Sequence, residues 1–176
     1  MLIGIKEGRR HCRYRSGMCK ACSSAGEEGT SSPSGGAETT GWEHFAHDAD
    51  IGVRGWGPTP ADAFAQAALA MTAVITDLDL VRESEAVRIE CTARQLDLLF
   101  HKWLNALVFE MATRGMLFRA FAVTIEGTRL TAIARGERID RERHMPAVEV
   151  KGATLTELKV EERQPGCWLA QCIVDV

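Results

Sequence analysis

The sequence has little surplus charge of either sign. Its 176 residues include 21 Lys and Arg against 24 Asp and Glu, which gives a net charge of -3. A protein that coats nucleic acid by neutralising phosphates needs a surplus of basic residues, so this composition argues against that class. Any role in nucleic-acid metabolism is expected to be local or indirect.

A long hydrophobic run is also missing. The longest apolar segment, residues 63–75, contains Gln66 and Thr72 and is shorter than the roughly 20 apolar residues that cross a bilayer. No continuous apolar stretch follows the basic residues near the N-terminus, as a secretory signal would require. We therefore expect a cytoplasmic protein without a membrane segment.

The cysteines do not form the even framework of a secreted protein, and we expect reduced thiols. Three lie in a polar head and three in apolar segments. A single Cys-x-x-Cys pair near a His-Cys pair is a weak zinc pattern, because it has no second pair and no apolar support. The head residues concerned are His11, Cys12, Cys19 and Cys22.

The first 40 residues differ in composition from the rest of the chain. Residues 1–22 are basic and lack apolar periodicity, and residues 23–40 are rich in Ser, Gly, Thr and Glu without a large apolar residue. Such segments cannot bury enough apolar surface to offset the entropy of ordering. We expect residues 1–40 to be a disordered head and linker, and residues 41–176 to form one domain.

Two segments of that domain have the apolar spacing of amphipathic helices. In 59–77, Thr59 and Asp62 have the spacing of a capping box and Pro60 suits the first helical position. In 92–115, the Thr-Ala-Arg-Gln sequence at its start predicts a second capping box, and Gly115 stands where a helix ends. Each helix should bury one face against a sheet.

Alternating apolar residues predict strands over 43–57, 87–91, 121–125, 130–134, 148–150, 155–160 and 168–176. Gly127 and Gly166 mark the turns of two hairpins. Two helices packed on a mixed, mainly antiparallel sheet make an α+β fold with a single domain.

The densest group of acidic and imidazole side chains lies in the segment WEHFAHDADIG, where alternation along one strand would place His44, Asp48 and Asp50 on one face, with His47 nearby. Neighbouring carboxylates repel each other unless a cation lies between them, so such a group favours a hard divalent ion. An exposed, charged strand end explains the same residues. The segment alone does not decide between the two.

The end of the sequence offers further oxygen donors. In a chain that ends at Val176, the terminal carboxylate is held beside the side chain of Asp175. If the last strand pairs beside the first, Asp50 adds a third donor, and an all-oxygen set suits calcium, magnesium or manganese better than zinc. The alternative is a frayed terminus, but the alternation in 168–174 indicates a docked strand.

The usual motifs of hydrolases, nucleotidyl transferases and proteases do not occur, and we therefore expect a protein that is not an enzyme. His144 lies in the polar loop 140–146 and is a further candidate for the site. A metal-dependent hydrolase that uses His47, Asp50 and His144 is the alternative. His101 is more simply a helix-surface residue. Binding of RNA by the basic head is a third hypothesis.

Five segments together resemble the archease family. The most specific are the opening HDADIG at 47–52 and the closing strand, which begins with WLAQ at 168 and stops at Asp175 and one aliphatic residue. The others are the helix 59–77, the loop 140–146 and the EVK sequence at 149–151. Four positions depart from the family pattern, which has Thr at Asp48, Glu at Met145 and an aromatic-His pair at Leu155 and Thr156.

The resemblance implies an accessory factor, and not the catalyst, for the RtcB-type RNA ligase that joins tRNA splicing ends with GTP and manganese. Family members promote guanylylation and repeated turnover of the ligase in a chaperone-like role. The resemblance therefore implies that this protein acts on tRNA only indirectly, through the ligase. They bind a divalent cation through acidic residues that match Asp50, Asp175 and the carboxylate of Val176. Calcium is the favoured ion, with manganese or magnesium as alternatives. Additional site residues are expected at His47, Asp48, His144 and Lys151.

Overall fold

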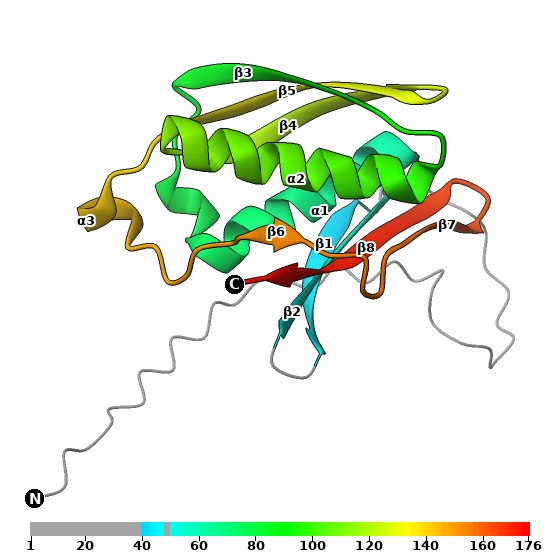
Figure 1. Cartoon of the computed structure of the whole chain (residues 1–176), viewed down its shortest axis with the longest axis horizontal. Helices are drawn as coiled ribbons and strands as arrows, with labels where there is room; N and C mark the ends of the chain where they lie inside the picture. Colours follow the sequence, from blue (N-terminus) through cyan, green and yellow to red (C-terminus); the bar gives the residue numbers. More distant parts are fainter. Residues whose placement is uncertain (1–39, 48–49) are drawn as a thin grey trace, which may run out of the picture.

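Two antiparallel sheets enclose two helices in the computed structural model, which describes residues 40–47 and 50–176 (Figure 1). Helices α1 (Pro60–Ile75) and α2 (Leu96–Arg114) lie beside each other, and each contacts strands of both sheets. The predicted α+β class is confirmed, although the strands form two sheets and not one. Within the described residues, no helix is long and apolar enough to cross a membrane.

Residues 1–39 of the predicted head, with its cysteines, and Asp48 lie outside the described residues. The boundary between head and domain therefore stays a prediction.

The first sheet contains β1 (Gly41–His47), β2 (Asp50–Gly57), β8 (Cys167–Asp175) and β6 (Gly152–Ala153) in that order, and β7 (Lys159–Gln164) also pairs with β8. The prediction of one strand over 43–57 is wrong. The chain reverses between His47 and Asp50, so β1 and β2 form a hairpin in which these two residues are opposite each other. The segment 148–150 is loop, and the strand predicted over 155–160 begins only at Lys159.

The second sheet has the order β3 (Glu85–Thr92), β5 (Arg129–Arg138) and β4 (Met116–Glu126). The alternation predicted for β3 is confirmed, because Val87, Ile89 and Cys91 are buried and their neighbours are exposed. The predicted hairpin of β4 and β5 is also confirmed, with Gly127 at a positive φ of 58° in its turn. Both sheets therefore turn apolar side chains toward the helices.

Local capping explains where the helices begin and end. Thr59 and Asp62 form the predicted capping box. The Thr59 hydroxyl accepts from the backbone N–H of Asp62 at 3.2 Å, and the Asp62 carboxylate accepts from the backbone N–H of Thr59 at 3.1 Å. The second predicted capping box is wrong, because Thr92 is the last residue of β3 and α2 starts after Gln95, which makes no capping bond. Gly115 ends α2, as predicted, and it does so in the left-handed conformation.

Helix α1 lies unusually close to β2. A Cβ atom on Gly55 would be 2.2 Å from the backbone nitrogen of Ala67 and 2.4 Å from the carbonyl oxygen of Ala63. Only a residue without a side chain allows this approach. The same layer contains the fully buried Phe64 and Trp103, and the indole nitrogen of Trp103 donates to the Phe64 carbonyl at 3.2 Å.

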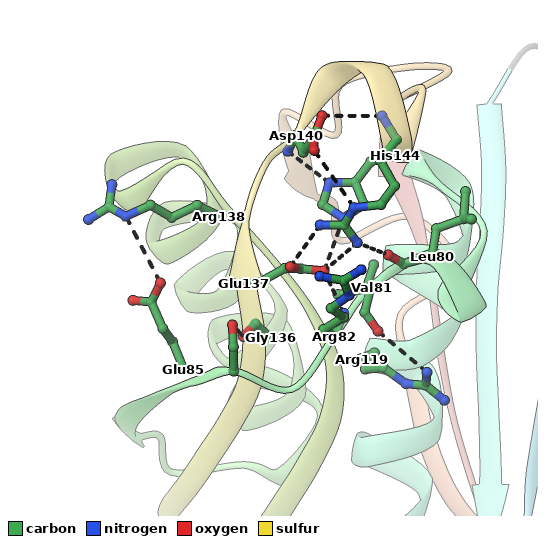
Figure 2. A network of polar contacts seen from close by, with 12 residues as sticks. Leu80, Val81, Arg82, Glu85, Arg119, Gly136, Glu137, Arg138, Asp140 and His144 are labelled. Carbon is green, nitrogen blue, oxygen red and sulfur yellow. Dashed lines mark hydrogen bonds and ion pairs between the residues drawn. The ribbon is translucent and has the colours of Figure 1, made fainter.

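A polar network holds the short helix α3 (Arg141–His144) against the end of β5 (Figure 2). The carboxylate of Glu137 accepts two hydrogen bonds of 2.8 Å from Arg143 and one of 2.6 Å from the backbone N–H of Arg82. Despite the cost of burial, the Arg143 bonds, helped by the Arg82 N–H and by His144, lower the pKa of Glu137 to about 2. Glu137 is therefore a charged structural anchor.

His144 completes this network from inside α3. Its Nδ1 accepts from the backbone N–H of Asp140 at 2.9 Å, so in the neutral ring the proton is on Nε2, which lies 3.2 Å from the Glu137 carboxylate. The His144 side chain is fully buried, and its carbonyl accepts from the Thr76 hydroxyl. His144 thus joins α3 to β5 through its ring and to the segment after α1 through its carbonyl.

Replacing Gly55 with Ala tests the close packing of α1 on β2. The added methyl group collides with backbone atoms, which cannot move without shifting the helix, so we expect a loss of at least about 3 kcal/mol in the free energy of unfolding. Gly115→Ala is the control, because it meets no atom within 4 Å and should cost only the roughly 1–2 kcal/mol of its left-handed backbone. Equal losses in urea unfolding would contradict the packing argument.

Glu137→Gln tests the anchor through its pH dependence. The pKa of Glu137 is lowered from 4.5 to about 2, so its charge stabilises the fold fully above about pH 4.5, and this contribution is lost as the pH falls toward 2. The difference in unfolding free energy between wild type and Glu137→Gln should therefore shrink over that range. Glu142→Gln, whose side chain has no hydrogen bond or ion pair within the described residues, should have little effect at pH 6. A pH-independent difference for Glu137→Gln would refute the assignment.

Candidate functional site

The pairing of β2 with β8 brings two aspartates together at one edge of the first sheet. These strands are antiparallel with Ile51 opposite Val174, and one further step along the ladder places Asp50 opposite Asp175. Both aspartates are exposed, and Val176 is half-buried beside them. The sequence predicted that Asp50 and Asp175 would lie together if the last strand paired with the first. In the structure the strand that pairs with β8 is β2, the second strand of the first hairpin.

Lys151 lies at the same edge because β6 pairs with the end of β8. Gly152 is opposite Asp175, and the backbone N–H of Lys151 donates to the Asp175 carbonyl at 2.8 Å. The Lys151 ammonium donates to a main-chain oxygen of Val176 at 3.0 Å. The end of the chain is therefore held in place by both a backbone and a side-chain contact.

Asn105 supports this edge from α2, and sequence reasoning missed it. Its amide bonds both backbone groups of Ala153, donating to the carbonyl and accepting from the N–H at 3.1 Å each. The pair of bonds fixes β6, and through it Lys151, on the helix. The signal in the sequence was a polar amide between Leu104 and Ala106 in an otherwise apolar stretch.

His47 is the second residue that borders Asp50. It is opposite Asp50 in the hairpin, and its Nδ1 is buried without a hydrogen-bond partner within the described part of the chain. A buried polar atom without a partner is uncommon. The structure thus places His47, Asp50, Asp175, Val176 and Lys151 at one end of the sheet.

The donor atoms at this edge suit a hard cation. The side chains of Asp50 and Asp175 form no ion pair with any residue that the structure describes, so their charges are available. Carboxylate and main-chain oxygens are the ligands that calcium, magnesium and manganese prefer. Residues 40–47 and 50–176 contain no group of three or more His, Cys, Asp or Glu side chains arranged for a metal ion. Among the described residues at this edge, Val176 offers a further oxygen beside the two aspartates.

Two histidines from the sequence hypotheses lie elsewhere. His44 is on β1 and its Nε2 lies 2.7 Å from the Ala70 carbonyl of α1, so the strand face predicted to join it to Asp50 does not form. His144 is buried in the network around Glu137, and α3 lies apart from the β1–β2 hairpin (Figure 1). Both ring nitrogens of His144 have protein partners. His144 is therefore not available as the third residue of the hydrolase hypothesis, beside His47 and Asp50.

Two further side chains bear on the chemistry. Burial raises the pKa of the Cys172 thiol to about 12, so this residue of β8 is neither a nucleophile nor a thiolate ligand. The carbonyl of Thr156 accepts a hydrogen bond of 3.1 Å from the backbone N–H of Ile173. The position lies beside β8, near the aspartate edge, and here it carries a hydroxyl.

Comparison with other proteins identifies a family. The model of the archease protein family matches residues 42–176. Archease proteins of Methanopyrus kandleri and Pyrococcus abyssi are 41% and 37% identical over 139 residues, which cover 77% of this chain and 99% and 98% of theirs. The solution structure of Methanobacterium thermoautotrophicum protein 1598 is similar with a TM-score of 0.68 and 32% identity, covering 77% of this chain and 99% of that one. The resemblance seen in the sequence is confirmed, and the chain belongs to the archease family.

Proposed function

We propose that this protein is a metal-binding accessory factor of an RtcB-type RNA ligase, acting in the cytoplasm in tRNA splicing or RNA repair. It promotes guanylylation and multiple turnover of the ligase and is not itself an enzyme. Membership of the archease family supports the accessory role. The observation that carries the metal assignment is the juxtaposition of Asp50 and Asp175 on neighbouring strands, without a protein cation paired to either side chain in the described structure.

In this proposal the cation ligands are Asp50, Asp175 and the terminal oxygens of Val176. Calcium is favoured, with manganese or magnesium as alternatives, because every donor is oxygen. A bound divalent ion supplies a fixed positive charge at this edge of the protein. Lys151 orients the Val176 oxygen through its 3.0 Å contact, and His47 borders Asp50 on its other side.

A reconstituted ligation reaction tests the accessory role. With the cognate ligase, GTP, manganese and excess RNA ends, the full chain should allow many ligations per ligase, and ligase alone should stop near one. The protein without ligase should join no RNA. Unchanged turnover in its presence would exclude the proposed function, and hydrolysis of a phosphate ester by the protein and manganese alone would favour the hydrolase instead.

Asp50→Asn should weaken binding of calcium and manganese by roughly tenfold or more, because the change removes one anionic donor while keeping the side-chain shape. Calorimetry measures the affinity, and ligase activation should fall in parallel. The control is Asp79→Asn, which removes another exposed carboxylate, whose one ion pair within the described structure is with Arg119 at 4.0 Å. If both variants bind the ion like wild type, Asp50 is not a ligand.

An extension of Gly-Ser after Val176 tests the terminal carboxylate. In a chain that ends at Val176, the extension converts this carboxylate into a neutral amide and adds residues at the site, so ion binding and ligase activation should both decrease. The same two residues added before Met1 should change neither. Wild-type affinity for the C-terminal extension would require a site built from Asp50, Asp175 and other donors.

A further inference from the structure

The end of the last strand lies against a strand of only two residues. Strand β6 consists of Gly152 and Ala153, which are opposite Asp175 and Val174 of β8. Strands of folded proteins usually have roughly three to ten residues, so a pairing this short does little to fix its own position. The residue before it is Lys151, whose backbone N–H donates to the Asp175 carbonyl at 2.8 Å. Whatever holds β6 in place therefore also places Lys151 at the aspartate edge of the first sheet.

Helix α2 lies on the other side of β6 (Figure 1). The side-chain amide of Asn105 donates to the Ala153 carbonyl and accepts from the Ala153 N–H, each at 3.1 Å. A residue of one strand binds a residue of a neighbouring strand through the same two groups, so the amide takes the place of a further strand beside β6. The backbone of Ala153 is thus satisfied from the helix.

The orientation of this amide is determined by its surroundings. Its nitrogen donates to the His101 carbonyl at 3.0 Å as well as to Ala153, and its oxygen faces the Ala153 N–H. Exchanging the two ends of the amide would break all of these bonds. Gly152 leaves room for the approach, because a Cβ atom there would lie only 3.0 Å from the amide oxygen. Asn105 is therefore held between its own helix and β6.

The contacts on both flanks of β6 lead on to the end of β8. Lys151 donates through its backbone N–H to Asp175 at 2.8 Å and through its ammonium to a main-chain oxygen of Val176 at 3.0 Å. On the other flank, the N–H of Thr154 donates to the Ile173 carbonyl at 2.9 Å. These bonds join residues 151–154 to residues 173–176, and the two bonds of Asn105 connect the whole group to α2.

We propose that Asn105 is a positioning residue for the aspartate edge. It fixes β6 on α2, and β6 in turn keeps Lys151 and the backbone of Asp175 where they meet the end of β8. Asn105 acts through β6 and does not itself contact the two aspartates. Loss of a group that supports metal ligands in this way typically lowers metal affinity roughly 10- to 100-fold. The part of this inference that concerns an ion rests on the proposed function, whereas the positioning of the edge does not.

Asn105→Leu in the full chain tests the positioning without an ion. The substitution keeps a side chain of similar size but removes both bonds to Ala153, so the Lys151 amide proton should exchange with solvent at least about tenfold faster in NMR measurements. The amides of Val53 and Cys172, in the middle of the β2–β8 pairing, should exchange at their wild-type rates. An unchanged Lys151 rate, or an equal acceleration of all three amides, would overturn the proposal.

Two further variants make the exchange experiment specific. Thr113→Ala is the matched control, because the Thr113 hydroxyl donates to the Phe109 carbonyl of the same helix at 2.7 Å, and its loss should leave the Lys151 rate unchanged. Asn105→Asp keeps the acceptor for the Ala153 N–H but loses the donor, and serves if Asn105→Leu does not fold. Its Lys151 amide should also exchange faster than in wild type. A wild-type rate in Asn105→Asp, or an equal effect of Thr113→Ala, rejects the positioning role.

Calorimetry with calcium connects the edge to the ion. Asn105→Leu should weaken calcium binding roughly tenfold relative to wild type, and Thr113→Ala should not change it. Wild-type affinity of Asn105→Leu would count against the proposal. A wild-type protein that binds neither calcium nor manganese refutes instead the metal assignment of the proposed function, and the exchange rate of the Lys151 amide then decides the role of Asn105 by itself.

Discussion

The antiparallel pairing of β2 with β8 is the contact on which the rest of the structure depends. It joins a strand near the start of the described chain to the last one, and β8 also pairs with β6 and β7. Residues 169–174 of β8 are all buried, as expected for a strand covered on both faces. The register of β2 against β8 also determines which carboxylates lie together at the end of the pair. The same strand pairing therefore positions both the core and the candidate metal site.

The carboxylates of this protein divide into two classes by their partners. Glu137 is bonded by Arg143, the Arg82 N–H and His144, and its charge is fully used in holding α3 against β5. Asp50 and Asp175 are exposed at a strand edge and have no cationic partner among the described side chains. A carboxylate that already has its counter-charge stabilises structure, whereas an unneutralised pair favours a cation. This contrast, more than the mere presence of acidic residues, locates the site.

Packing of polar groups connects α2 to that edge. Asn105 ties β6 to the helix, β6 pairs with the end of β8, and Lys151 contacts Val176. The chain of contacts runs from α2 to Val176 through the Asn105 amide, the backbone bonds between β6 and β8, and the Lys151 ammonium group. These contacts hold Asp175 and Val176 in place at the end of β8.

Local features of the structure were determined by the sequence itself. The Thr59 capping box, the left-handed Gly115, the alternation of β3 and the β4–β5 hairpin all depend on residues close together in the chain. The archease motifs also identified the family, and the expected meeting of Asp50 with Asp175 required only that the end strands pair. Such patterns are readable because spacing along a helix or strand fixes which side chains share a face.

Only the tertiary structure decided the long-range contacts. The segment 43–57 alternates like one strand, but a reversal at His47 and Asp50 makes two, which separates His44 from the site. His144 and Glu137 meet because α3 folds back on β5, and nothing in the spacing of the loop required it. The division of strands between two sheets was equally hidden. Periodicity reports which face of an element is buried, whereas register and partner choice come from packing between segments far apart in the chain.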